Sequence, residues 1–303
     1  MEPAPRRPER LLDPAFVRTL ELLRRRLDVR ARSGGPGEHG GRKRGGSAEF
    51  QEHRPYAPGD DVRRIDWAAF ARTDEPVIKT FRLEEDVLVR LVCDTSASLG
   101  VGTPPKLDAS KRLAAALGYL ALASSERVSL VLAEGGAASA RPTGRGRGAL
   151  PPLLQRLDAL VPSGGTDLSR SLDAVVRAGG RPGLLAVVSD FLDPGPFLGA
   201  LARAASAGHD VTLVHVVAPD ELEPTLEGDL ALEDAETGAV VEVTVDAAAV
   251  RAYQQRFAAH CEALGAFAKR RGGTYVRARS DEPLEAPLTR LVARAVDPAP
   301  GHA

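Results

Sequence analysis

Short apolar runs alternate with segments of helical spacing over most of the chain. The apolar runs lie at 87–93, 127–134, 184–189, 210–217 and 274–278. The helical segments lie at 106–124, 150–160, 168–178, 196–207, 246–271 and 284–296. Strands that are apolar along their whole length are typical of a parallel sheet covered by helices on both faces. The pattern therefore predicts an α/β fold with a doubly wound, mostly parallel sheet flanked by helices.

Changes in this pattern indicate the domain boundaries. We expect an N-terminal helix, a glycine-rich loop and an irregular or β segment over 1–83, followed by the α/β domain over 84–296. The helix is predicted to start at Asp13-Pro14, because an N-cap residue followed by proline is a helix start signal. Within the α/β domain, 229–245 reads as an inserted β-hairpin. The proline-rich end, 297–303, is expected to be a disordered tail.

Composition narrows the class of protein. The formal net charge of -1 gives no global field that would attract nucleic acid or an anionic membrane. Two cysteines, Cys93 and Cys261, are too few for a disulfide framework, so a reducing, cytoplasmic setting is favoured. The longest apolar run, 113–123, is far shorter than the roughly 20 residues that cross a bilayer. We therefore expect a soluble protein without a membrane span.

Two segments before residue 84 have an open interpretation. The glycine-rich stretch 33–47 contains Arg42-Lys43-Arg44, and a solvated loop is favoured there over a nucleic-acid or phosphate contact. The stretch 50–72 combines turn residues, arginines, aspartates and the single tryptophan, Trp67. A structural role, with arginine–carboxylate pairs fixing irregular backbone, is favoured there over an active site.

Oxygen-bearing side chains follow two of the apolar runs. Asp94, Ser96 and Ser98 follow the first run at alternate positions, and Asp190 follows another. In open α/β sheets, ligands bind outside the carboxyl ends of the strands. Thr166, at a glycine-rich helix start, would add a further hydroxyl. Such donors suit a hard divalent cation, Mg²⁺ or alternatively Mn²⁺ or Ca²⁺, whereas a single aspartate in this place would more often be a turn or helix cap.

These residues resemble the metal-ion-dependent adhesion site of von Willebrand factor A domains, with the pattern Asp94-x-Ser96-x-Ser98 followed by Thr166 and Asp190. The motif within the stretch 50–72 resembles a large prokaryotic family of unknown function. Members of that family carry such a domain and are typically encoded beside MoxR-type AAA+ ATPases. Segments 232–238 and 281–284 also resemble that family. The motif positions, whose role is not assigned, are Arg54, Tyr56, Gly59, Asp60, Asp61, Arg64, Asp66 and Trp67.

Two departures from the family pattern limit what is carried over. Leu99 stands where members often have methionine, a substitution of similar volume. Many relatives begin with membrane-spanning helices that this chain lacks, so no membrane-linked role is carried over.

The resemblance implies a non-catalytic, metal-dependent protein-binding module. It would serve a MoxR-type AAA+ ATPase as adaptor or co-chaperone in protein or complex maturation, and a protein partner, the ATPase or its client, would supply a carboxylate to the ion. One alternative is a Mg²⁺-dependent hydrolase or phosphatase with Asp94 as nucleophile. Haloacid-dehalogenase-like phosphatases place an aspartate nucleophile at such a strand end and need a second carboxylate two residues on as general acid, and here that position is Ser96, a poor acid. A second alternative is a scaffold with a vestigial site.

Overall fold

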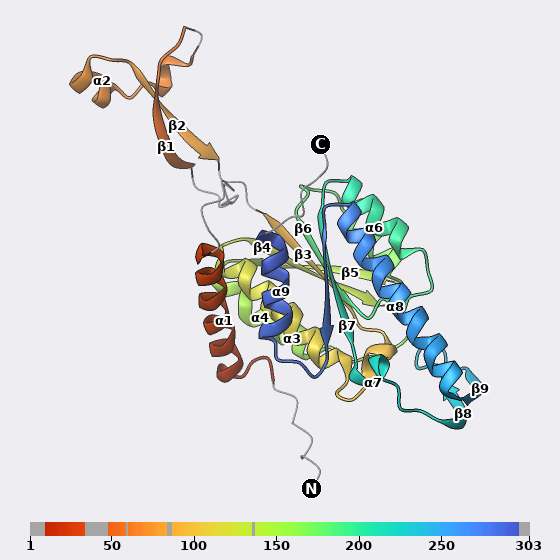
Figure 1. Cartoon of the computed structure of the whole chain (residues 1–303). Coiled ribbons are helices and arrows are strands. Elements are labelled where there is room, and N and C mark those ends of the chain that lie inside the picture. Colours follow the sequence, from red (N-terminus) through yellow and green to blue (C-terminus); the bar gives the residue numbers. More distant parts are fainter. Residues whose placement is uncertain (1–9, 34–47, 59, 84–86, 135–136, 297–303) are drawn as a thin grey trace. The chain divides into compact units, whose positions relative to one another are not determined.

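The computed structural model describes residues 10–33, 48–58, 60–83, 87–134 and 137–296 (Figure 1). These residues form two compact units, one drawn from 1–37 and 88–303 and the other from 38–87. We had placed the N-terminal helix together with the segment that follows it. The structure assigns that helix to the α/β unit instead, because its apolar face is buried there. The glycine-rich stretch 34–47, the tail 297–303 and Gly59 lie outside the described residues.

A six-stranded sheet forms the centre of the α/β unit, and it confirms the predicted α/β class. The strand order is β10-β7-β6-β3-β4-β5, in which β5 alone is antiparallel to its neighbour. The strands are β3 (Leu88–Asp94), β4 (Arg127–Glu134), β5 (Ala137–Arg145), β6 (Leu184–Ser189), β7 (Asp210–Val217) and β10 (Thr274–Arg279). All five predicted strands form within one or two residues of their expected bounds.

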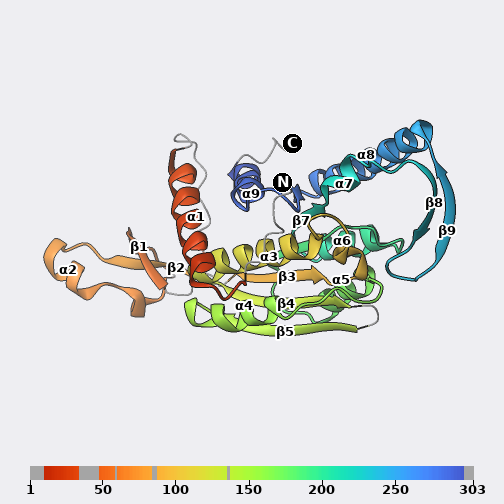
Figure 2. The ribbon, with the colours of Figure 1, turned by 90° about the horizontal axis from the view of Figure 1, so that it is seen from below.

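Helices cover the two faces of this sheet (Figure 2). On one face, α3 lies over β3 and β4, beside α4, α1 and α9; on the other, α5, α6 and the C-terminal half of α8 pack on β3, β6 and β7. The helices are α1 (Pro14–Ser33), α3 (Lys106–Ala123), α4 (Leu150–Asp158), α5 (Leu168–Arg177), α6 (Phe197–Ser206), α7 (Pro219–Leu222), α8 (Ala247–Arg270) and α9 (Glu285–Val296), with short 3-10 turns η2 (Ala97–Gly100) and η3 (Arg147–Ala149).

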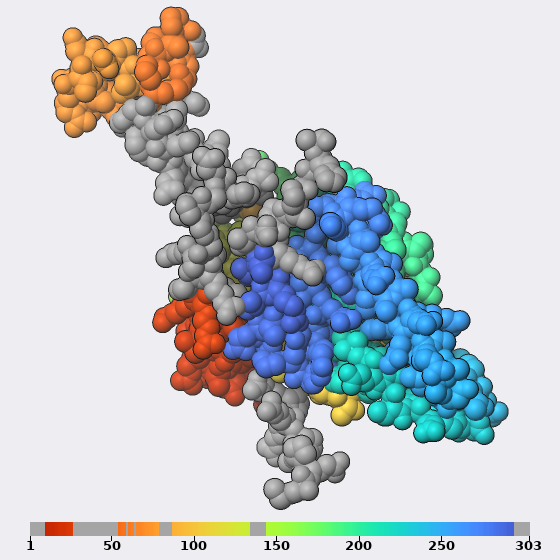
Figure 3. Space-filling view, in the orientation of Figure 1, coloured from red at the N-terminus to blue at the C-terminus, as the bar shows by residue number. Residues whose placement is uncertain are grey.

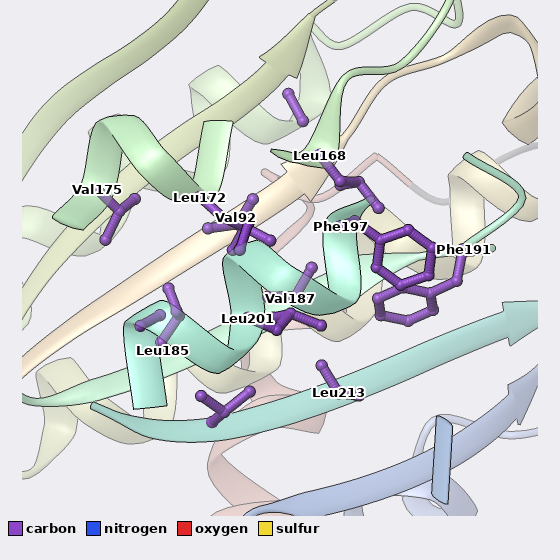
Figure 4. Packing of buried hydrophobic residues seen from close by; sticks show 14 of the residues in the cluster. Val92, Leu168, Leu172, Val175, Leu185, Val187, Phe191, Phe197, Leu201 and Leu213 are labelled. Carbon is purple, nitrogen blue, oxygen red and sulfur yellow. The ribbon is translucent and has the colours of Figure 1, made fainter. Parts of the chain in front are cut away.

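A cluster of buried apolar residues lies under α5 and α6 (Figure 4). Val92 of β3 and Val187 of β6 are completely buried there, against Leu172 of α5 and Leu201 of α6. Because side chains alternate along a strand, the neighbour of Val92, Leu91, faces the opposite helix layer, where it approaches Gly118 of α3. This two-sided burial accounts for the continuous apolar runs of the sequence.

Aspartate caps fix the starts of α1, α5 and α8, and the first of them is the cap that Asp13-Pro14 predicted. Asp13 Oδ1 accepts a hydrogen bond from Ala15 N at 2.8 Å. Asp167 accepts from Arg170 N at the start of α5, and Asp246 accepts from two backbone amides at the start of α8. Each cap satisfies backbone N–H groups that the first helical turn leaves without partners.

The first helix completes the layer beside α9. Leu11, Phe16, Leu20 and Leu23 are each less than 5% exposed. Leu11 N donates to Asp158 Oδ1 at 3.2 Å, at the end of α4. An isolated helix of 20 residues has little stability of its own, so this burial explains why α1 is part of the α/β unit.

The second unit is an antiparallel hairpin with a folded tip. Its strands are β1 (Ala48–Pro55) and β2 (Val77–Leu83), and its tip contains η1 (Val62–Arg64) and α2 (Trp67–Thr73). Arg54 pairs bidentately with Asp60, with N–O distances of 2.8 and 2.6 Å, which confirms the predicted arginine–carboxylate bracing. The hydrogen bond from Arg54 also lowers the pKa of Asp60. The strand β1 agrees with the expected irregular or β segment, whereas the expectation of irregular backbone over 50–72 was wrong for α2, which is a regular helix.

The hairpin expected at 229–245 is present as β8 (Gly228–Glu233) and β9 (Val240–Val245), paired only with each other among the described strands. Asp234 Oδ1 accepts hydrogen bonds from Glu236 N at 2.8 Å and Thr237 N at 3.0 Å and so fixes the turn. None of the helices in the described ranges combines the length and apolar character of a membrane span.

Candidate functional site

Two aspartates meet at the carboxyl edge of the sheet. Asp94 is the last residue of β3, and Asp190 follows directly after β6, its parallel neighbour. Each side chain is about 1% exposed. Since the carboxyl ends of neighbouring parallel strands lie at one edge, the two carboxyl groups are brought together as predicted.

A continuous chain of hydrogen bonds joins four of the five predicted site residues. Asp94 Oδ1 accepts from Ser96 N at 2.9 Å, and Ser96 Oγ lies 2.9 Å from Ser98 Oγ. Ser98 Oγ in turn donates to Asp190 Oδ2 at 2.8 Å. A residue that we had not predicted, Ser189, donates to Asp94 Oδ2 at 2.6 Å and accepts from the backbone N–H of Phe191.

Thr166 lies on a loop that is hydrogen-bonded to this segment. Ser163 N donates to Thr95 O, and Ala97 N donates to Gly164 O, both at 2.9 Å. The Oγ1 atom of Thr166 is buried and has no hydrogen-bond partner within the described residues. Buried hydroxyls are nearly always satisfied, so this atom is available to a ligand or an ordered water.

Lys106 is a site residue that the sequence analysis missed. Its side chain is 1% exposed, and its Nζ donates to Asp190 Oδ2 at 2.8 Å and to Glu221 Oε1. Glu221, from α7 at the end of β7, is held in turn by Ala218 N, which donates to Oε2 at 2.7 Å. One signal was present: Lys106 is the first residue of α3, where the helix dipole disfavours a cation.

The electrostatic balance at this edge is negative. Burial and the charge of Asp190 raise the pKa of Asp94 to about 6, against the opposing hydrogen bonds from Ser189 and Ser96. Burial would lower the pKa of Lys106, but the charges of Asp190 and Glu221 outweigh it and raise that pKa. Three carboxylates and one ammonium leave a formal charge of -2 when all are ionised. A divalent cation would neutralise that charge.

The donor set fits a hard cation and little else. Asp94, Ser96, Ser98 and Thr166 present only oxygen atoms, which Mg²⁺, Mn²⁺ and Ca²⁺ prefer. Within the described ranges, no group of three or more His, Cys, Asp or Glu residues is arranged to hold a metal ion. A cation here would therefore depend on the serine and threonine hydroxyls as much as on the carboxylates.

Other candidate groups lie outside this arrangement. Burial and the neighbouring Asp94 raise the pKa of Cys93 to about 12, so its thiol stays protonated and serves packing. His215 is fully buried on β7, and burial, followed by the charge of His260, lowers its pKa to about 3. The described residues of the upstream motif, from Arg54 to Trp67, belong to the second unit.

The chain is similar in part to several solved structures. Among solved structures, BatB from Bacteroides thetaiotaomicron is similar with a TM-score of 0.44 and 19% identity, over 70% of this chain and 100% of that one. The vWF domain of the pili tip protein Mfa5 from Porphyromonas gingivalis has a TM-score of 0.29 and 14% identity, over 68% and 86% of the two chains.

Sequence relatives cover nearly the whole chain. The uncharacterized proteins Rv1480 of Mycobacterium tuberculosis and Mb1516 of Mycobacterium bovis are each 34% identical over 285 residues, which is 92% of this chain and 88% of theirs. The family model described as "Protein of unknown function DUF58" matches residues 52–263, from the second unit into α8. On these matches, the chain belongs to the DUF58 family of proteins of unknown function.

Proposed function

We propose that this protein is a non-catalytic binding module that holds one divalent cation, Mg²⁺ or alternatively Mn²⁺ or Ca²⁺, and binds a protein partner through it. Asp94, Ser96 and Ser98 would hold the ion, with Thr166 and Asp190 completing its surroundings. The observation that carries the proposal is the hydrogen-bonded chain of hydroxyls and carboxylates at adjoining strand ends. The formal charge of -2 supports a divalent ion.

The bound ion would supply an electrophilic centre with a position open to a carboxylate of the partner. The protein's own residues prepare that centre. Ser189 and the Ser96 amide orient the Asp94 carboxylate, and Lys106 holds Asp190 through its Oδ2. Because Lys106 already compensates Asp190, the ion would retain more of its positive charge toward the partner.

We further propose that the partner is a MoxR-type AAA+ ATPase or its client, with this chain as adaptor or co-chaperone. This step rests on the family resemblance seen in the sequence. Membership of the DUF58 family is consistent with this partner but does not identify it. The process would be maturation of a protein or complex.

Binding is favoured over catalysis by the residues around Asp94. A phosphatase using Asp94 as nucleophile needs a proton donor beside it, and Ser96 is a poor acid. The nearby cation, Lys106, is paired with two carboxylates, so it also makes a poor acid. Hydrolysis of a generic phosphate ester that disappears in Asp94→Asn would overturn this choice.

The first experiment measures metal binding directly, by calorimetric titration of Mg²⁺ and Mn²⁺ into the full chain. We expect one ion per chain in the wild type and none in Asp94→Ala or Asp190→Asn. The matched control is Asp193→Asn, since Asp193 is also buried near the end of β6 but, among the described residues, accepts hydrogen bonds only from the backbone amides of Leu168 and Gly195. Unchanged metal binding by Asp94→Ala would refute the site.

The second experiment adds a MoxR-type ATPase from the same genome, with Mg²⁺ or with EDTA. The proposal expects association that requires the metal and is lost in Asp94→Ala but kept in Asp193→Asn. Association that is the same in EDTA would reject the metal-dependent interface while leaving the ion site intact. No association in either condition would reject the ATPase as partner.

A further inference from the structure

The hairpin formed by β8 and β9 has one apolar face and one acidic face. The register places Leu230 opposite Val243 and Leu232 opposite Val241, so these side chains share a face, which Val245 extends. The opposite face carries Asp229, Glu233, Val240, Glu242 and Thr244. An apolar sheet face is normally packed against another element, so its covering is informative.

Only one half of the apolar face is covered. Leu230, Val243 and Val245, in the half near α8, are partly buried. Leu232 and Val241, in the half near the turn, are 42% and 58% exposed. Figure 3 shows the surface that this hairpin and the start of α8 make at one end of the α/β unit. The uncovered half therefore presents apolar side chains to solvent.

The hairpin is held in place at both ends. At the turn, Glu236 Oε2 accepts from Thr166 N at 3.4 Å, on the loop that belongs to the candidate site. At the base, β9 runs directly into α8 through the Asp246 cap, and Tyr253 of α8 ties that helix to α7 by donating to the backbone oxygen of Glu221 at 2.9 Å. A two-stranded hairpin alone is marginally stable, and these contacts fix it beside the site.

The charge of this region has one sign. Residues 219–246 contain ten aspartate and glutamate residues and no lysine or arginine, in a chain whose total is nearly neutral. Both outer edges of the hairpin are free of other described strands, so their backbone N–H and C=O groups remain open to pairing. Two copies of such an acidic hairpin repel each other, which disfavours self-pairing.

We propose that this hairpin is a docking surface for an extended segment of a partner protein in which apolar residues alternate with lysine or arginine. The segment adds as a third strand along one edge of the hairpin, so that its apolar side chains extend the face that carries Leu232 and Val241 and its basic side chains lie on the face that carries Glu233 and Glu242. Main-chain pairing of this kind supplies affinity while alternate side chains supply specificity. The inference does not depend on the ion, so it stands or fails apart from the proposed function.

The test uses the full chain in EDTA and three fluorescein-labelled eight-residue peptides, alternating Lys and Val, Glu and Val, or Lys and Ser. Fluorescence anisotropy should show binding of the Lys–Val peptide alone, weakened by added salt. The double substitution Leu232→Ser and Val241→Ser should weaken that binding by about tenfold. The matched control pairs Leu22→Ser with Leu198→Ser, which are exposed apolar positions on α1 and α6, and should bind like the wild type.

A charge-reversed variant separates the electrostatic contribution. Glu233→Lys with Glu242→Lys keeps the apolar face and should weaken binding of the Lys–Val peptide, because two of the ten acidic residues of 219–246 become basic. Equal binding of the Lys–Val peptide by the wild type and the Leu232/Val241 variant would overturn the proposal. So would dimerisation of the wild type, measured by sedimentation, that disappears in that variant, because the occupant would then be a second copy.

Discussion

The replacement Asp94→Asn should make the metal-free protein more stable at neutral pH. The Asp94 carboxyl is buried beside Asp190, and its pKa is raised from 3.8 to about 6. That difference corresponds to about 3 kcal/mol of destabilisation from ionising the group in the folded protein. An asparagine keeps the shape and the acceptor for Ser96 N but leaves the Ser189 hydroxyl without its acceptor, which costs about 1 kcal/mol. The expected gain is about 2 kcal/mol.

The stability difference between wild type and Asp94→Asn should depend on pH. A carboxyl with a higher pKa in the folded protein binds its proton more tightly when folded. Ionisation therefore lowers the free energy of unfolding as pH rises from about 3.8 to about 6, and the full penalty remains above that range. The advantage of Asp94→Asn should be complete at pH 7.5, and at pH 4 it should give way to a small disadvantage, because the cost of the lost Ser189 acceptor does not depend on pH.

Urea unfolding in EDTA, at pH 7.5 and at pH 4, measures both values. Far-UV circular dichroism is the suitable signal, because the single tryptophan, Trp67, lies in the second unit and reports on that unit. An Asp94→Asn protein that is no more stable than wild type at pH 7.5 would refute the electrostatic reasoning, as would a difference that is equal at both pH values. Asp193→Asn is again the control: both oxygens of Asp193 accept from backbone amides, so an asparagine there loses one acceptor and should bring no gain in stability.

Two further predictions concern buried titratable side chains, Lys106 and His215. Lys106→Met removes the ammonium between Asp190 and Glu221, so the metal-free protein should lose about 3–5 kcal/mol at pH 7.5 in urea unfolding. The control Lys111→Met, at a partly buried lysine that donates to the backbone oxygen of Asp158, should change little. A loss in Lys106→Met no larger than that of the control would contradict the prediction. Burial of His215 lowers its pKa from 6.5 to about 3, so the unfolded chain takes up a proton below pH 6.5 that the folded protein resists, and stability falls as pH decreases. In His215→Leu, the fall in unfolding free energy between pH 7.5 and pH 5 should be smaller by about 2 kcal/mol, and an unchanged fall would reject this origin.

The strands and helices of the α/β unit could be predicted closely because their apolar residues follow the period of each element. β4, β6 and β7 have the expected bounds, and α3 ends one residue before the predicted end. The second unit was harder to predict. Its helix α2 is seven residues long and buries only Ala69 fully, so it leaves little periodic signal. The structure there depends on Arg54, Asp60 and the Asp66 cap.

The candidate site was predictable where chemistry follows directly from strand ends. Asp94 and Asp190 each end an apolar run, and the parallel rule alone brings them to one edge. Lys106 lies 12 residues after Asp94, at the start of α3, and Glu221 lies 31 residues after Asp190, in α7. No local sequence pattern links either residue to Asp190. Only the packing of α3 against the sheet brings the ammonium to the two carboxylates.

The sequence by itself determined the fold class, the strand edge and the oxygen donors of the candidate site, because hydrophobic period and strand ends are local properties. The tertiary structure decided the charge balance of that site. It places Lys106 and Glu221 beside the aspartates and brings Glu236 of the hairpin to the Thr166 loop. These pairings join residues 70 to 115 positions apart, and such contacts depend on how whole elements pack rather than on any pattern within one of them.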